Sequence, residues 1–67
     1  MQTENYDCYM LFYCLKDDKS RAFKLYGAYA GFEQAKEGIS ETEKFDHYIE
    51  AANFNLPAHT IRVYQSW

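Results

Sequence analysis

The hydrophobic pattern of the chain begins with residues 6–15, where nine of ten positions are apolar or aromatic. This run is too short to cross a bilayer as a helix, which takes about 20 apolar residues. Its aromatic content favours a β-strand. Alternate positions are apolar on both sides, so both faces of the strand need cover, as expected of a central strand. The pattern therefore predicts a central strand over residues 6–15.

A second strand is predicted over residues 20–26, where polar and apolar side chains alternate. The polar stretch Lys16-Asp17-Asp18-Lys19-Ser20 lies between the two apolar runs and is typical of a hairpin turn. We therefore expect residues 6–15 and 20–26 to pair as antiparallel strands.

A short helix is predicted over residues 32–39. Three apolar side chains fall on one face at helical spacing: Phe32, Ala35 and Ile39. Glu33 and Glu37 lie on the face expected to meet water, and Gly38 is expected to mark the end of the helix. This amphipathic pattern predicts that the helix packs its apolar face on the sheet.

The segment after Ser40 fits two structures. Ser40 and Glu43 match the spacing of a helix-capping box, and apolar residues over 45–52 also recur at helical spacing. The same residues alternate nearly as well as a strand, so periodicity alone does not decide. We favour a strand, because residues 40–44 make a natural loop and a two-stranded hairpin needs further strands for stability.

The last element is a strand over residues 59–65, with alternating β-branched side chains, after a loop over 53–57. The predicted fold class is α+β, a small antiparallel sheet with one short helix in the order ββαββ. The alternative order is ββααβ, with a second helix in place of the third strand.

Composition agrees with one small domain over residues 6–67, preceded by a loose N-terminus over 1–5. A chain of 67 residues buries only about 60% of its unfolded surface, which makes stability marginal. Thirteen aromatic residues compensate, because each can bury roughly 150–250 Å². The first residues lack the basic and apolar segments of a secretory leader, so the expected location is cytoplasmic.

The two cysteines are expected to be reduced. Cys14 lies six positions after Cys8 on one extended strand, which places them roughly 20 Å apart. A disulfide needs Cα atoms within about 7 Å, so the pair cannot form one within a single chain.

No motif in the chain points to a chemistry. The only histidines are His47 and His59, no Gly-x-Ser-x-Gly elbow occurs, and no Lys-Ser or Lys-Thr follows a glycine as in a phosphate-binding loop. The Cys and His spacings match no metal-ligand pattern. We therefore expect no enzymatic activity, no cofactor and no metal.

Acidic residues concentrate between positions 33 and 50, where six acidic and two basic side chains give a net charge of −4. This segment is either a solvated face or a surface that docks on a basic partner. The carboxylates that we select for partner binding are Glu33, Glu37, Glu41 and Glu43.

The tyrosines suggest a second contact surface. A single helix can cover only one face of the sheet, which leaves either the set with Tyr9, Leu11 and Tyr13 or the set with Tyr6, Met10 and Phe12 uncovered. Exposed aromatic residues can stack single-stranded bases, but ten acidic against seven basic residues argue against nucleic acid. A protein partner is the better expectation, with Tyr9 and Tyr13 as contact residues.

The layout of the chain, a short hairpin followed by one helix that opens Phe32-Glu33-Gln34-Ala35-Lys36, resembles several small phage-encoded inhibitors, including some anti-CRISPR proteins. The resemblance covers size and architecture over most of the chain and assigns no residue a role. It implies a protein that binds host nucleoprotein complexes without catalysis.

These observations predict a non-enzymatic protein–protein interaction module. The first strand is apolar on both faces and has one helix to cover it, so self-association as a twofold homodimer is also expected. Two other classes stay open: a single-stranded nucleic-acid-binding module that uses a Tyr-rich face, and a small enzyme that uses a Cys/His or carboxylate pair. No membrane association is expected.

Overall fold

A computed structural model describes residues 6–39, 43–54 and 59–67. Its elements in chain order are β1 (Cys8–Leu15), β2 (Lys24–Tyr29), α1 (Phe32–Glu37), β3 (Phe45–Asn53) and β4 (His59–Gln65). The predicted loose N-terminus at 1–5, the possible capping residue Ser40 and residues 55–57 of the predicted loop lie outside the described residues.

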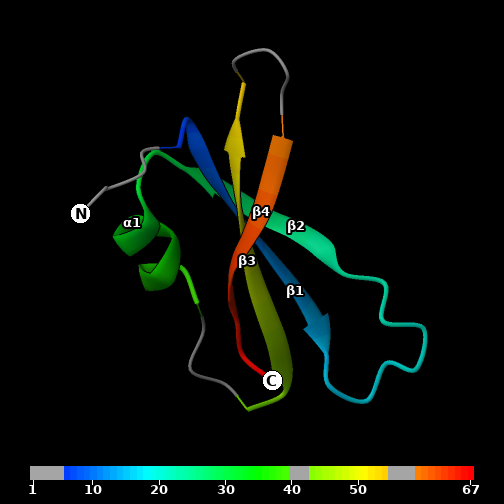
Figure 1. Ribbon diagram of the computed structural model, residues 1–67. Coiled ribbons are helices and arrows are strands. Elements are labelled where there is room, and N and C mark those ends of the chain that lie inside the picture. Colours follow the sequence, from blue (N-terminus) through cyan, green and yellow to red (C-terminus); the bar gives the residue numbers. More distant parts are fainter. Residues whose placement is uncertain (1–5, 40–42, 55–58) are drawn as a thin grey trace.

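The four strands form one antiparallel sheet in the order β2-β1-β3-β4. The short helix α1 packs on one side of this sheet, against β1 and β2 (Figure 1). We call this side of the sheet the helix side and the opposite side the helix-free side. The predicted α+β class is confirmed. The predicted ββαββ order is confirmed only along the chain, since the pattern did not specify the lateral order of the strands.

The segment over residues 45–53 is a strand, so the helical alternative for it is wrong. Hydrogen bonding explains the choice: β3 pairs with β1 on one edge and with β4 on the other. Five of its nine residues are buried, distributed over both faces of the strand. A helix there would leave the edges of β1 and β4 without a partner.

The predicted bounds of the first two strands need correction. β1 begins at Cys8 rather than at Tyr6, and β2 covers 24–29 rather than 20–26. Arg21 has a φ of 53°, a left-handed conformation that interrupts extended backbone before β2. At the other end the strand continues through Gly27, which pairs with Leu11.

Gly27 and Gly38 are required because Tyr29 packs close to both. A Cβ atom on Gly27 would lie 2.8 Å from the Tyr29 hydroxyl oxygen, and one on Gly38 would lie 2.7 Å from the same atom. Separations this short do not occur between real side chains, so Tyr29 would have to move. The two glycines thus serve close packing between β2 and the end of α1, and neither has a positive φ.

The core lies on the helix side and is built from Leu11, Ala35 and Ile49, all fully buried. Leu11 and Ile49 are partners across β1 and β3. Partly buried side chains surround them: Tyr9, Tyr29, Phe32, Ile39 and Tyr64. The prediction that Phe32, Ala35 and Ile39 pack on the sheet is therefore confirmed.

Candidate functional site

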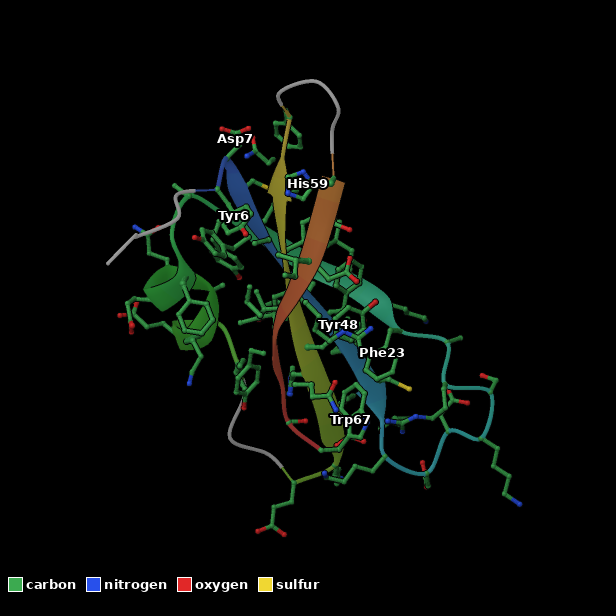
Figure 2. All side chains as sticks on the ribbon, viewed as in Figure 1. Tyr6, Asp7, Phe23, Tyr48, His59 and Trp67 are labelled. Carbon is green, nitrogen blue, oxygen red and sulfur yellow. The ribbon has the colours of Figure 1, made fainter. Side chains whose placement is uncertain are left out.

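The helix-free side of the sheet carries a cluster of aromatic rings and guanidinium groups, which we call the aromatic–arginine surface. Its members are Phe12, Phe23, Tyr48, Trp67, Arg21 and Arg62. They come from β1, β3, β4, the connection between β1 and β2, and the residues after β4. Figure 2 shows Phe23, Tyr48 and Trp67 gathered at one end of the sheet, away from α1.

Strand alternation places the first two rings together. Phe12 and Tyr48 are cross-strand partners on β1 and β3, and their rings stack with centroids 4.7 Å apart. Phe23 and Trp67 form a second stack at 5.3 Å. Phe23 meets the Tyr48 ring edge-on at 4.8 Å, which joins the two stacks into one layer. Such pairs contribute about 0.5–1.5 kcal/mol each beyond their buried area.

Two arginines lie over these rings. The Arg62 guanidinium carbon is 4.0 Å from the centroid of Tyr48, and the Arg21 guanidinium carbon is 5.1 Å from that of Phe23 and 5.4 Å from that of Trp67. A guanidinium group can stack on a ring and still present its N–H groups at the edge of the stack. The surface therefore combines apolar area with guanidinium groups, and the Glu50 carboxylate lies 4.0 Å from Arg62 Nη2.

A buried carboxylate holds this surface together. Asp46 on β3 is only 5% exposed, and it accepts hydrogen bonds from Lys16 Nζ at 2.6 Å and from Arg21 Nη2 at 2.8 Å. The hydroxyl of Ser66 lies 3.4 Å from the same carboxylate and accepts the backbone N–H of His47 at 2.9 Å. Asp46 thus fixes the segments that carry Arg21 and Trp67.

Hydrogen bonds from Lys16 and Arg21 lower the pKa of Asp46 and outweigh the effect of burial. The carboxylate is therefore ionised at neutral pH. This placement corrects one sequence-based expectation, because Asp46 belongs to the acidic segment but is not part of a solvated face. It neutralises the two cations beside it.

The structure separates the residues that the sequence predicted for partner binding from the aromatic–arginine surface. Tyr9 and Tyr13 both lie on the helix side and are half-buried, Tyr9 against Phe32 and Tyr13 against Tyr26 and Phe45. The uncovered set of β1 is accordingly the one with Met10 and Phe12.

The predicted acidic contact residues are exposed where they are described. Glu33 and Glu37 lie on the outer face of α1, and Glu43 lies in the turn before β3. Glu41 lies outside the described residues. Their role in partner binding stays a prediction.

The structure keeps Cys14 and His47 apart. Both thiols are free, as predicted. Cys14 is opposite Asp46 across the strand pair, whereas His47 is opposite Tyr13, so the thiol of Cys14 and the imidazole of His47 lie on opposite faces of the sheet. Burial and the nearby Asp18 carboxylate raise the pKa of Cys14, which disfavours the reactive thiolate.

In the part of the chain that the structure describes, no three His, Cys, Asp or Glu side chains come close enough together to hold a metal ion. The expected absence of a metal nevertheless stays a prediction. Within the same residues, no helix is long and apolar enough to cross a membrane.

Sequence reasoning missed most of the aromatic–arginine surface. One signal was present: a strand over 45–52 next to the first strand puts Tyr48 and Phe12 on compatible faces. The positions of Phe23 and Trp67 had no such signal, because both lie outside the strands and are placed by ring stacking and by the contacts around Asp46.

Comparison with known proteins gives no relative: no family model, no curated protein and no solved structure matches this chain.

Proposed function

We propose that this protein is a non-enzymatic interaction module that docks its aromatic–arginine surface on a partner protein. The observation that carries the proposal is the layer of stacked rings and guanidinium groups on the side of the sheet that no helix covers. Trp, Tyr and Arg are the residues that most often dominate binding energy in protein interfaces. Preformed stacking reduces the entropy that side chains lose on binding.

Ring geometry favours a protein over single-stranded nucleic acid. Base stacking requires free ring faces. Here Phe12 stacks on Tyr48 while Arg62 lies over the same ring, and Phe23 and Trp67 stack on each other. These stacks occupy one face each of Phe12, Phe23 and Trp67, so a base finds fewer free faces here than on an open aromatic sheet, whereas apolar side chains of a protein can pack on edges and faces alike.

Charge indicates the character of the partner surface. Both charged groups over the rings of this surface are arginines, Arg21 and Arg62. The neighbouring carboxylate of Asp46 is buried and paired. Lys16 and Arg21 share Asp46, and Arg62 Nη2 lies 4.0 Å from Glu50 Oε2, so little net positive charge remains on this surface. We therefore infer a partner that presents an apolar centre with hydrogen-bond acceptors for the guanidinium N–H groups. The exposed carboxylates of Glu33 and Glu37 on α1, with that of Glu43 in the turn before β3, are a separate candidate contact for a basic patch.

The architectural resemblance to small phage-encoded inhibitors supports binding without catalysis as the mode of action. Two free cysteines, Cys8 and Cys14, are compatible with the reducing cytoplasm that we propose as the location.

The test compares two side chains of equal exposure on opposite sides of the sheet. Trp67 is 50% exposed on the aromatic–arginine surface, and Ile61 is 49% exposed on the helix side, opposite Ala51. Tagged wild-type protein, Trp67→Ala and Ile61→Ala are used to capture proteins from a lysate of the source cell, followed by quantitative mass spectrometry. We expect one protein to be retained by wild type and Ile61→Ala and lost with Trp67→Ala.

Three other results would contradict the proposal. Loss with the double variant Glu33→Lys/Glu37→Lys but not with Trp67→Ala would place the contact on the acidic helix. Salt-sensitive micromolar binding of single-stranded DNA or RNA, weakened by Arg62→Gln, would favour the nucleic-acid class. Light scattering that reports two copies per particle, reverting to one with Trp67→Ala, would show that a second copy of the chain covers the surface.

A further inference from the structure

A pocket lies on the helix side of the sheet, beyond the C-terminal end of α1. It is half-open, has a volume of about 200 Å³ and is lined by Tyr13, Tyr26, Phe45, His47 and Gly38. Its residues come from β1, β2, β3 and the helix cap, so the sheet itself fixes their relative positions. The aromatic–arginine surface contributes none of them.

Three aromatic rings form the walls of this pocket at steep mutual angles. The rings of Tyr13 and Tyr26 are inclined at 89° with centroids 5.9 Å apart, and those of Tyr13 and Phe45 at 69° with centroids 5.7 Å apart. Rings arranged around a corner can each turn electron-rich surface toward one enclosed group. This is the geometry by which aromatic cages bind cations.

The lining carries no carboxylate, ammonium or guanidinium group. His47 is buried, and burial lowers the pKa of its imidazole, so the ring is neutral at physiological pH. Lys24 lines the neighbouring pocket that shares Tyr13 and Phe45, and Lys16 lies near enough to His47 to contribute to its lowered pKa, but neither lysine lines the pocket itself. A cation entering the pocket therefore meets aromatic rings, two phenol groups and an imidazole.

This lining suits a methylated ammonium better than a simple one. An unmethylated ammonium is strongly hydrated and needs three hydrogen-bond acceptors to replace its water. A quaternary ammonium has no N–H to satisfy, is larger and more weakly hydrated, and gains both dispersion and electrostatic attraction from ring faces.

We propose that Tyr13, Tyr26 and Phe45 form an aromatic cage that binds a quaternary ammonium group, carried by a small molecule or by a trimethylated lysine side chain. The cage is independent of the docking role of the aromatic–arginine surface, so either proposal can fail without the other.

The decisive probe is choline against its uncharged carbon isostere, 3,3-dimethylbutanol, which has the same shape without the charge. Two-dimensional NMR of the full chain follows both titrations. We expect saturable shifts at Tyr13, Tyr26 and Phe45 with choline, and binding of the isostere weaker by about tenfold, the scale of a partly desolvated cation–π contact. Equal binding of the two compounds, or no choline-induced shift at these residues, overturns the proposal.

Variants of Tyr26 distinguish the effect of losing its aromatic ring from the effect of losing the fold. Tyr26 is 60% exposed, so its replacement should leave folding intact, and its neighbour Leu25 is 56% exposed on the opposite side of the sheet. We expect Tyr26→Phe and Leu25→Ala to bind choline as wild type does and Tyr26→Leu to bind about tenfold more weakly. Retained affinity in a folded Tyr26→Leu protein would refute the cage.

A peptide pair identifies the source of the group. Tighter binding of a trimethyllysine peptide than of both choline and the unmethylated peptide would assign the cage to a protein ligand. Binding of choline at least as tight as that of the trimethyllysine peptide would assign it to a small molecule. Preference for the unmethylated peptide would overturn the proposal.

Discussion

The two sides of the sheet cover their apolar side chains in different ways. On the helix side, α1 removes Leu11 and Ile49 fully from solvent. On the helix-free side, Phe12 and Tyr48 are only half-buried and obtain their cover from each other, from Phe23 and Trp67, and from arginines. One side is closed by a secondary-structure element, and the other is closed by contacts between side chains.

Because of this difference, the helix side mainly stabilises the fold, whereas the helix-free side keeps side chains accessible to a partner. Fully buried aliphatic side chains contribute through lost contact with water and through close packing, and a cavity there is costly. Stacked, partly exposed rings contribute less to folding but keep their outer edges accessible to a partner. If the two sides divide these tasks, the loss of stability should be largest for substitutions in the core and smallest for substitutions in the outer layer of rings and arginines.

The largest effect is expected at the core. Leu11→Ala removes a fully buried side chain beneath α1 and should lower the free energy of unfolding by about 2–5 kcal/mol. Urea denaturation followed by circular dichroism measures the change. The matched control is Leu25→Ala, an exposed leucine on β2, which should change stability by less than about 0.5 kcal/mol. Similar losses in both variants would break the distinction between the two sides.

The second-largest loss of stability is expected at the buried carboxylate of Asp46. Asp46→Asn weakens charge-assisted hydrogen bonds to Lys16 and Arg21 and should cost about 1–3 kcal/mol, since both partners are partly solvated. The exposed Asp17→Asn is the control. Because the folded pKa of Asp46 lies below its ordinary 3.8, its stabilisation is present above that pH and is lost as pH falls through the folded value. The free energy of unfolding of Asp46→Asn should therefore depend less on pH in the acid range than that of wild type. An unchanged pH dependence would show that Asp46 does not stabilise the fold through its charge.

Protonation of His47, on the helix side, should have a smaller effect on stability. Burial lowers the pKa of His47 below 6.5, so the unfolded chain takes up a proton before the folded chain does. Stability should be complete above pH 6.5 and fall toward the folded pKa, by at most about 1.4 kcal/mol per pH unit. Melting temperatures between pH 7.5 and 5 should decline in wild type and in the exposed His59→Gln control. They should decline less in His47→Phe; an equal decline would assign the effect to other groups.

The smallest change is expected at the outer layer. Arg62→Gln removes the guanidinium over Tyr48 and should cost only about 0.5–1 kcal/mol, the range for an exposed cation–π contact. Chemical denaturation of Arg62→Gln is compared with that of Lys19→Gln, a solvent-exposed control. A loss as large as that of Leu11→Ala would show that the helix-free side is a second core.

Much of the fold was predictable because the decisive pattern is local. The alternation over 59–65 predicted β4 with its observed bounds, and the apolar spacing of Phe32, Ala35 and Ile39 predicted how α1 packs. The start of β2 was not predictable from alternation, because it depends on the left-handed conformation of Arg21. That conformation accompanies an ion pair to Asp46, a residue far away in the sequence.

The site was less predictable than the fold. Composition indicated an aromatic contact surface, and the two alternative faces of β1 were identified, but only the position of α1 decides between Tyr9 and Phe12 as the uncovered side. The contributions of Phe23, Trp67 and both arginines arise from tertiary contacts between segments with no regular period. Pattern-based reasoning has no access to such contacts.

The position of β1 between β2 and β3 also has a kinetic consequence. β2 is close in sequence, so the first hairpin can form early, but alone it lacks the partner that buries Leu11. That partner, Ile49, arrives only after a long loop closes, which is the slow and entropically costly step in sheets with non-local pairing. We expect the rate-limiting step of folding to be the docking of β3 on a preformed β1–β2 hairpin. Amides in the centre of β1 and β3 should then exchange with solvent only through global unfolding.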